Sequence, residues 1–236
     1  MNLAIIPARG GSKRIPRKNI LNFMGKPLIA YSIEVAITSK LFDRIIVSTD
    51  DPEIARIANE FGADTPFLRP AYLSDDEAET SAVVKHALQW CNTNYASAKI
   101  VCCIYATAPL MQSIYLQNGL EILQNTKKHY ALGVTDFPYP IQRAIRITSK
   151  GEIEMMSPIH KSTRSQDLES AYHDAGQFCW GWAKSYLEDA PILSNDTAPV
   201  ILPRCLVQDI DTMEDWRQAE LMYEAMQMRV RIGNSF

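Results

Sequence analysis

Short β-branched runs alternate with longer helical patterns along residues 1–135, and this alternation constrains the fold more than any other feature. Strands that alternate with helices usually pair in parallel through right-handed crossovers. The pattern predicts an α/β fold with a Rossmann-like, mostly parallel sheet covered by helices on both faces, and such sheets bind ligands beyond the carboxyl ends of their strands. The expected strands are residues 3–6, 44–48, 65–68, 100–105 and 130–135, and the expected helices are residues 28–38, a helix that Asp51 caps before Pro52, residues 80–92 and residues 113–125.

This alternation stops after Asp136. Residues 137–174 contain three prolines, two short alternating runs and a polar basic stretch, residues 160–166. We interpret residues 137–174 as an inserted lobe of hairpin and loop, of the kind that packs against a partner subunit or covers a site. A strand at residues 177–182 and a long helix at residues 213–228 complete a single domain, residues 1–236.

Basic side chains are concentrated at the start of the chain. The 236 residues include 24 Lys and Arg against 27 Asp and Glu, a net charge of −3. Residues 1–33 hold six basic side chains and no acid, so the remainder carries a charge of −9. A protein that binds nucleic acid over its whole surface needs a basic balance, and no aromatic residues are interleaved with these cations. We therefore expect a local site for an anion and no nucleic-acid partner.

The cysteines and the N-terminal segment indicate the compartment. Five cysteines, an odd number without C-x-x-C spacing, favour free thiols in a reducing cytoplasm. The first residues lack a basic n-region, and no apolar run approaches the roughly 18 residues of a membrane span. We expect a cytoplasmic protein with no membrane partner.

The loop after the first expected strand has the residue types that bind phosphate. Its sequence, residues 7–19, is P-A-R-G-G-S-K-R-I-P-R-K-N, which contains neither G-x-G-x-x-G nor a P-loop lysine motif. Adjacent glycines allow backbone N–H groups to turn toward an anion, a serine adds a hydroxyl, and three cations can neutralise a triphosphate. These residues are Gly10, Gly11, Ser12, Arg9, Lys13 and Lys18.

Five segments resemble the CMP-sialic acid synthetase family of cytidylyltransferases, over nearly the whole chain. They are residues 4–19, 42–50 (FDRIIVSTD), 68–71 (LRPA), 107–110 (TAPL) and 209–212 (DIDT). The resemblance implies a nucleotide-diphospho-sugar transferase type of sheet and a homodimer joined through the inserted lobe. The implied reaction transfers CMP from CTP to the anomeric hydroxyl of a sugar acid and releases pyrophosphate.

The resemblance also implies which residues bind CTP. The cations and Ser12 of the loop would hold the triphosphate, and Asn19 with the Ala8 backbone would lie near the cytosine. Phosphoryl-type transfer needs mainly positioning and charge neutralisation, which these residue types provide. The expected CTP-binding residues are Ala8, Arg9, Gly10, Gly11, Ser12, Lys13, Lys18, Asn19 and Arg69, and the expected catalytic residues are Arg9, Lys18 and Asp211.

Asp209 and Asp211 are the expected magnesium ligands, as the resemblance implies. In an extended segment, residues two apart point to the same face, and Mg²⁺ is usually held by one or two carboxylates and substrate phosphates. An alternative and compatible interpretation is that Asp211 and Thr212 cap the last helix. Asp50 either adds a polar group to the site or only starts the following helix.

Two departures from the neuraminate pattern bear on the sugar acid. Tyr105 and Met111 stand where neuraminate enzymes of the family have glutamine and arginine, and residues 172–181 read Y-H-D-A-G-Q-F-C-W-G. Both features resemble the pseudaminic acid branch, whose nine-carbon 2-keto acid has a deoxy terminus and two acylamino groups. Such a sugar suits a less polar wall, and Phe178 and Trp180 are either part of that wall or core residues.

Sugar binding also requires a cation for the carboxylate, for which arginine is best suited. Arg164, in the inserted lobe, is the first candidate and could come from a neighbouring subunit; His160, Lys161 and His173 are further options, and no residue is indicated as general base. The expected sugar-binding residues are Tyr105, Thr107, Arg164, Asp174 and Gln177.

Two alternatives remain open from the sequence. The acceptor could instead be N-acetylneuraminate or 3-deoxy-manno-octulosonate, although the loop only partly matches enzymes of the latter. A protein of another class, a nucleotide-binding regulator without catalysis, would keep the loop but need not keep the acidic pair.

Overall fold

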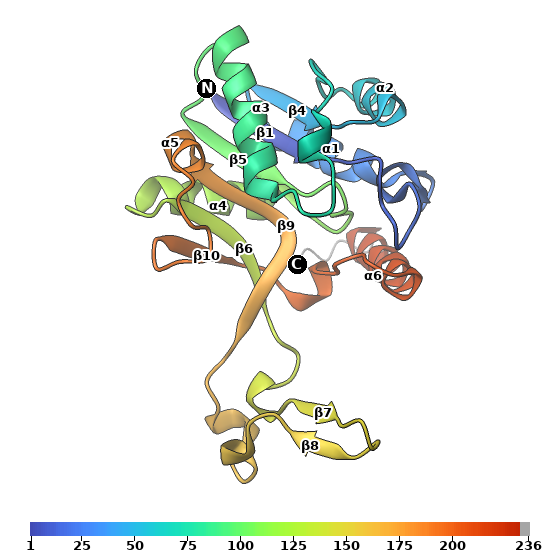
Figure 1. Ribbon diagram of the computed structural model, residues 1–236, viewed down its shortest axis with the longest axis vertical. Coiled ribbons are helices and arrows are strands. Elements are labelled where there is room, and N and C mark those ends of the chain that lie inside the picture. Colours follow the sequence, from blue (N-terminus) through green and yellow to red (C-terminus); the bar gives the residue numbers. More distant parts are fainter. Residues whose placement is uncertain (232–236) are drawn as a thin grey trace.

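The computed structural model describes residues 1–231, and its centre is a six-stranded sheet (Figure 1). Within this sheet, strand β9 is antiparallel to both of its neighbours, and the other three strand pairs are parallel. The predicted mostly parallel α/β fold is therefore confirmed. In order across the sheet, the strands are β10 (Thr197–Ile201), β6 (Tyr130–Asp136), β9 (Tyr172–Trp182), β5 (Ile100–Ile104), β1 (Asn2–Pro7) and β4 (Arg44–Ser48).

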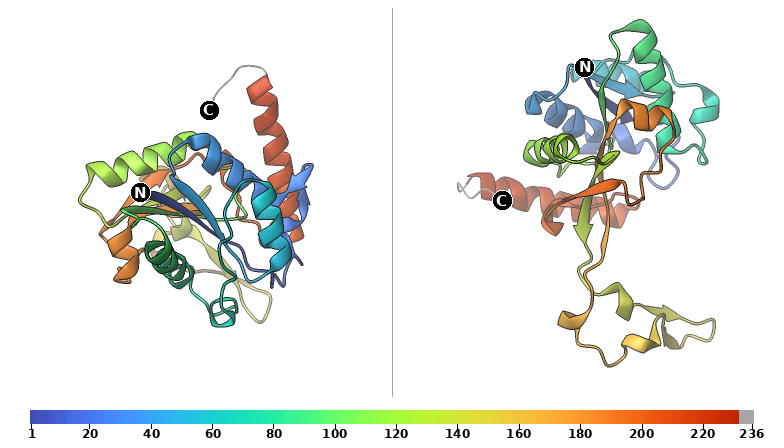
Figure 2. Two further views of the ribbon diagram at one scale, coloured as in Figure 1. Left: turned by 90° about the horizontal axis from the view of Figure 1, so that it is seen from above. Right: turned by 90° about the vertical axis from the view of Figure 1, so that its left-hand side faces the viewer.

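Helices cover both faces of this sheet (Figure 2). On one face, α1 (Leu28–Ser39), α2 (Pro52–Glu60) and α4 (Ser113–Asn125) contribute to the larger apolar cluster. On the other face, α3 (Thr80–Asn94) and α5 (Ala183–Leu187) pack on a second cluster. Successive β1 residues alternate between the two clusters, as strand geometry requires.

The C-terminal helix α6 (Met213–Arg231) packs beside the loop that follows β1. A short hairpin, β2 (Asn22–Phe23) and β3 (Lys26–Pro27), extends from that loop. Phe23 contacts Trp216 of α6 edge-on, with 5.3 Å between the ring centroids, and Ile15 and Ile210 are buried in the same cluster. Residues 7–19 are called here the cationic loop. Because Ile210 is buried in this cluster, Asp209 and Asp211 on either side of it are held next to that loop.

Residues 137–171 leave the sheet between β6 and β9 and form an arm that extends away from it (Figure 1). The arm contains the antiparallel pair β7 (Ile145–Ile147) and β8 (Ile153–Met155). Of the inserted lobe expected at residues 137–174, the last three residues lie in β9.

Most predicted elements match within three residues, but the strand expected at residues 65–68 is wrong. Asp64 and Leu68 form only isolated bridges, to Ile46 of β4 and to Thr49 just after it, because Pro66 has no N–H to continue a ladder. Strand β10 was not predicted, since Pro199 interrupts its pattern; proline is tolerated because β10 is at the sheet edge.

The cysteines and helices bear on two further expectations. All five cysteines are free thiols, as predicted, and four of them are buried. Within residues 1–231, no helix combines the length and the hydrophobicity needed to cross a membrane.

Candidate active site

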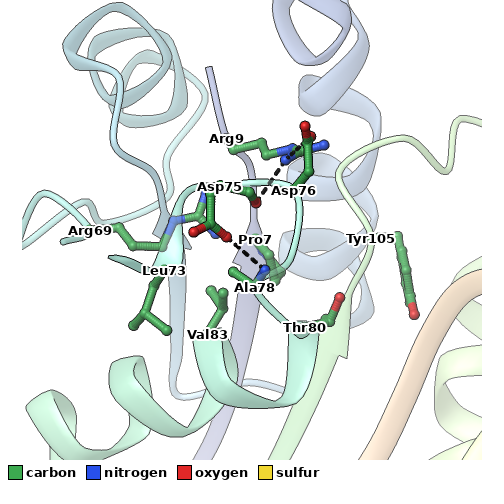
Figure 3. A pocket seen from close by; sticks show the side chains of 10 residues that line it. All are labelled: Pro7, Arg9, Arg69, Leu73, Asp75, Asp76, Ala78, Thr80, Val83 and Tyr105. Atoms are coloured by element: carbon green, nitrogen blue, oxygen red, sulfur yellow. Dashed lines mark hydrogen bonds and ion pairs between the residues drawn. The ribbon is translucent and has the colours of Figure 1, made fainter. Parts of the chain in front are cut away.

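Two adjoining pockets lie beyond the carboxyl end of β1. The first, called here the Arg69 pocket, has a volume of about 250 Å³ and is lined mainly by Arg69, Leu73, Asp75, Asp76, Ala78, Thr80 and Val83 (Figure 3). The second, the loop pocket, has a volume of about 480 Å³ and is bounded by the cationic loop and residues 105–107. Four residues line both pockets: Pro7, Arg9, Asp76 and Tyr105.

The cationic loop is fixed to the end of β4 by two adjacent carboxylates. Asp50 accepts the Gly10 N–H at 2.9 Å. Asp51 caps α2, as predicted, by accepting the N–H groups of the second and third residues after it, and its other oxygen lies 2.6 Å from Arg17. A Cβ at Gly10 would approach Asp51 to 2.7 Å, whereas one at Gly11 would meet nothing within 4 Å. Asp50 therefore holds the loop backbone and does not start the helix, which begins with the Asp51 cap.

The side chains of the loop divide into those that line the loop pocket and those that fix the backbone. Asn19 is buried and donates to the Arg9 carbonyl at 2.9 Å, so it orders the loop as well as lining the pocket. Ala8 is buried, lines neither pocket, and donates its N–H to the Ser48 carbonyl. The loop residues that line the loop pocket are Arg9, Ser12, Lys13, Arg14, Lys18 and Asn19.

Asp76 neutralises two of the predicted triphosphate-binding cations. Its carboxylate lies 2.7 Å from Arg9 and also pairs with Lys13, and hydrogen bonds from these two side chains lower the pKa of Asp76. Sequence reasoning did not identify Asp76, because an exposed acid in a polar loop gives no signal of the cations it will meet.

Arg69 is a buried cation with unused hydrogen-bonding capacity. Its side chain is 4% exposed and forms an ion pair with Asp50 at 3.7 Å. Among residues 1–231, neither its Nε nor its Nη2 has a hydrogen-bond partner. Burial lowers the pKa of Arg69, and the Asp50 carboxylate opposes this shift. Buried donors without partners are uncommon, so Arg69 is suited to a ligand acceptor in its pocket.

The acidic segment before α6 meets the loop from the opposite side. Asp211 lies 2.7 Å from Arg14 and 3.4 Å from Lys18, which also donates to the Ile210 carbonyl. Removal of water by surrounding protein atoms and repulsion from Asp211 raise the pKa of Asp209. Among residues 1–231, no three His, Cys, Asp or Glu side chains form a metal cluster.

Helix α6 is capped without the Asp211 carboxylate. Thr212 Oγ1 accepts the Asp215 N–H at 3.3 Å, and Asp215 accepts the Thr212 N–H at 2.7 Å, which is a reciprocal capping box. The Asp211 side chain is thus available to the loop cations. Arg14, like Asp76, was not assigned a role from sequence, because only the fold brings it to the acidic segment.

Two of the five predicted sugar-binding residues line the loop pocket, namely Tyr105 and Thr107. Burial raises the pKa of Tyr105, which keeps its hydroxyl protonated as a donor. Asp174 lies on β9 and accepts the Gly176 N–H, and Arg164 belongs to the arm; neither lines either pocket.

Strand β9 contributes packing and support rather than a pocket wall. Gln177 is 3% exposed, and its side-chain amide donates to the Leu206 carbonyl, so it holds the segment that leads to Asp209. Phe178 and Trp180 are fully buried, which confirms the core alternative for both. Gln177 was predicted to face the sugar, and the alternation of β9 could not reveal that its side chain is enclosed.

Comparisons with known proteins agree over most of the chain. Residues 3–229 match the family described as Cytidylyltransferase. The chain is 47% identical to the pseudaminic acid cytidylyltransferase of Campylobacter jejuni, over 94% of this chain and 96% of that protein. It is 31% identical to the N-acylneuraminate cytidylyltransferase of Escherichia coli, over 92% of this chain and 51% of that protein.

A solved structure shares the fold. The structure of CMP:2-keto-3-deoxy-manno-octonic acid synthetase complexed with CTP matches with a TM-score of 0.70 and 15% identity, over 95% of this chain and 98% of that one. Because the family match extends over almost every described element, the chain belongs to the cytidylyltransferase family.

Proposed function

We propose that the protein transfers CMP from CTP to the anomeric hydroxyl of pseudaminic acid, giving CMP-pseudaminate and pyrophosphate. The observation that carries this proposal is the 47% identity, along nearly the full length of both chains, with the Campylobacter jejuni enzyme. Identity to the neuraminate enzyme is 31%, and Tyr105 stands where the neuraminate pattern has glutamine. Neuraminate and octulosonate are therefore the less supported acceptors.

The reaction requires strong charge neutralisation around CTP. The hydroxyl oxygen attacks the α-phosphorus, a phosphorus–oxygen bond forms, and the bond to pyrophosphate breaks. Fixed cations that face the phosphate oxygens lower the barrier to such a transfer. Arg9, Lys13 and Lys18 line one pocket, which supports their assignment to the triphosphate, and Ser12 and the Gly10–Gly11 backbone belong to the same loop.

The cytosine is assigned to the Arg69 pocket. Arg69 has two donor atoms without partners among residues 1–231, and the cytosine ring carries carbonyl and ring-nitrogen acceptors. Arg9 lines both pockets, so a nucleotide with its base beside Arg69 would pass Arg9 before reaching Lys18. Asn19 and Ala8 support this arrangement by ordering the backbone of the loop.

The acidic segment suits Mg²⁺. Asp209 and Asp211 are close enough for their charges to repel, and Arg14 and Lys18 lie where a cation would relieve that repulsion. Two carboxylates leave the remaining positions for phosphate oxygens and water, as Mg²⁺ prefers. Bound Mg²⁺ would neutralise charge on the phosphates and lower the pKa of the attacking hydroxyl.

The arm supports a homodimer. Several large apolar side chains on it are exposed, including Ile147 at 76%, Ile153 at 73% and Ile159 at 83%. Exposed apolar surface of this extent usually marks an interface, and a second copy is the proposed occupant. Arg164 could then bind the sugar carboxylate in the site of the neighbouring copy, and Asp174 could contribute to the same sugar. The free thiols fit a cytoplasmic enzyme.

The proposal is tested by incubating the purified protein with CTP, Mg²⁺ and each of three sugar acids. Pyrophosphate release is expected with pseudaminate, and at most slow release with N-acetylneuraminate or 3-deoxy-manno-octulosonate. Release with neuraminate alone would overturn the assigned acceptor. CTP binding without release on any acid would favour the non-catalytic regulator.

A further inference from the structure

The ion pair between Arg9 and Asp76 lies where the Arg69 pocket and the loop pocket meet. Both residues line both pockets, and Figure 3 shows Asp76 directed at the Arg9 guanidinium. A ligand with its base in one pocket and its phosphates in the other must therefore pass this pair.

The loop that carries Asp76 is attached to Arg9 at two points. Arg9 donates to the Asp75 carbonyl at 2.8 Å and lies 2.7 Å from the Asp76 carboxylate. Lys13 pairs with the second oxygen of Asp76. The Asp75 side chain accepts the backbone N–H groups of Glu77 and Ala78, which sets the turn that presents Asp76.

We propose that Asp76 is an internal competitor of the triphosphate: its carboxylate occupies the positions on Arg9 and Lys13 that phosphate oxygens take, and it must leave when the nucleotide binds. This inference rests on the proposed function. The proposed function names residues that favour nucleotide binding. This inference adds Asp76, which opposes it.

The charges on each side explain why the exchange is reversible. Asp76 offers one negative charge at a half-exposed position, and exposed ion pairs contribute little each. A triphosphate brings several charges to the same cations and prevails. Once pyrophosphate has left, the single phosphate of the product competes with Asp76 on more equal terms, so the return of Asp76 favours product release.

The test compares ligand affinities of three purified proteins by calorimetry: the wild type, Asp76→Asn and Glu77→Gln. Glu77→Gln is the matched control because this substitution removes the same charge from the same turn. The Glu77 side chain lines neither pocket. The ligands are CTP, inorganic triphosphate and cytidine. Asp76→Ala is a second variant, since the Asn amide oxygen can still accept from Arg9.

The competitor role predicts that Asp76→Asn binds CTP and inorganic triphosphate about three- to tenfold more tightly than the wild type. Cytidine affinity should change less than twofold, and Glu77→Gln should resemble the wild type with every ligand. Unchanged or weaker triphosphate binding in both Asp76 variants would overturn the role. Tighter binding of inorganic triphosphate with no binding of CTP by any protein would keep the competitor and overturn the proposed function.

Discussion

Lys18 and Asp211 lie 3.4 Å apart although they come from opposite ends of the chain. Lys18 donates to the Ile210 carbonyl beside Asp211, and Ile210 is fully buried against the β2–β3 hairpin. The packing of one apolar residue thus joins the proposed triphosphate site to the proposed metal site. Substitutions at the two ends of this contact should separate binding from catalysis.

Replacing Lys18 by alanine should weaken CTP binding itself. The variant removes a cation whose hydrogen bonds to phosphate are charge-assisted, which corresponds to a Kd about ten- to hundredfold higher. Calorimetric titration with CTP measures this change. Lys127→Ala, an exposed lysine in the loop after α4, is the control and should bind CTP as the wild type does. Unchanged CTP affinity in Lys18→Ala would mean that the triphosphate binds elsewhere.

Asp211→Ala should bind CTP and fail to turn it over. The variant removes a proposed magnesium ligand but leaves every cation of the loop pocket in place, so CTP affinity should stay within about threefold of the wild type. The pyrophosphate release rate should fall at least about hundredfold, since the Mg²⁺ that would stabilise developing charge loses one of its two proposed ligands. Glu214→Gln, in the first turn of α6, is the control with normal turnover. Full activity in Asp211→Ala would remove this residue from the metal site.

The two adjacent glycines of the loop should differ in their tolerance of alanine. At Gly10, a Cβ would lie 2.7 Å from the Asp51 carboxylate oxygen that binds Arg17, and the other oxygen of Asp51 caps α2. Gly10→Ala should therefore lower the free energy of unfolding by about 1–3 kcal/mol. Gly11→Ala meets no atom within 4 Å and should change it by less than about 0.5 kcal/mol. Urea denaturation compares the two, and equal losses would contradict the close approach of Asp51.

A charge placed on the arm should disrupt the proposed homodimer. Ile147 is 76% exposed in the single chain, and burying a glutamate against a second copy is unfavourable without a partner. Ile147→Glu should shift the protein from dimer to monomer in light scattering at micromolar concentration. Ile114→Glu, on an exposed position of α4, is the control and should remain dimeric. A wild-type monomer with full activity would refute the dimer.

The sequence predicts secondary structure and sites formed by contiguous residues better than it predicts contacts between distant segments. Alternating runs indicate the helices and most strands, and residues 7–19 reveal an anion site because the glycines and cations are contiguous. The pairing of Asp76 with Arg9 depends on where two loops meet above the sheet, which no local pattern encodes.

Strand β9 illustrates a second limit. Gln177 and Trp180 belong to one strand, and residue type alone suggests that a glutamine near a site binds substrate. The structure buries Gln177, and its amide donates to the Leu206 carbonyl and so supports a loop. The role of this polar side chain thus depends on a partner that lies 29 residues later in the chain.

The most direct measurement is mass detection of the product formed from CTP and pseudaminate in the presence of Mg²⁺. CMP-pseudaminate should accumulate in equal amount to the pyrophosphate released, and should be absent when Asp211→Ala replaces the wild type. A CMP-sugar formed from another sugar acid, with none from pseudaminate, would contradict the proposed acceptor. CTP bound by the wild type without any CMP-sugar would contradict the proposed catalysis.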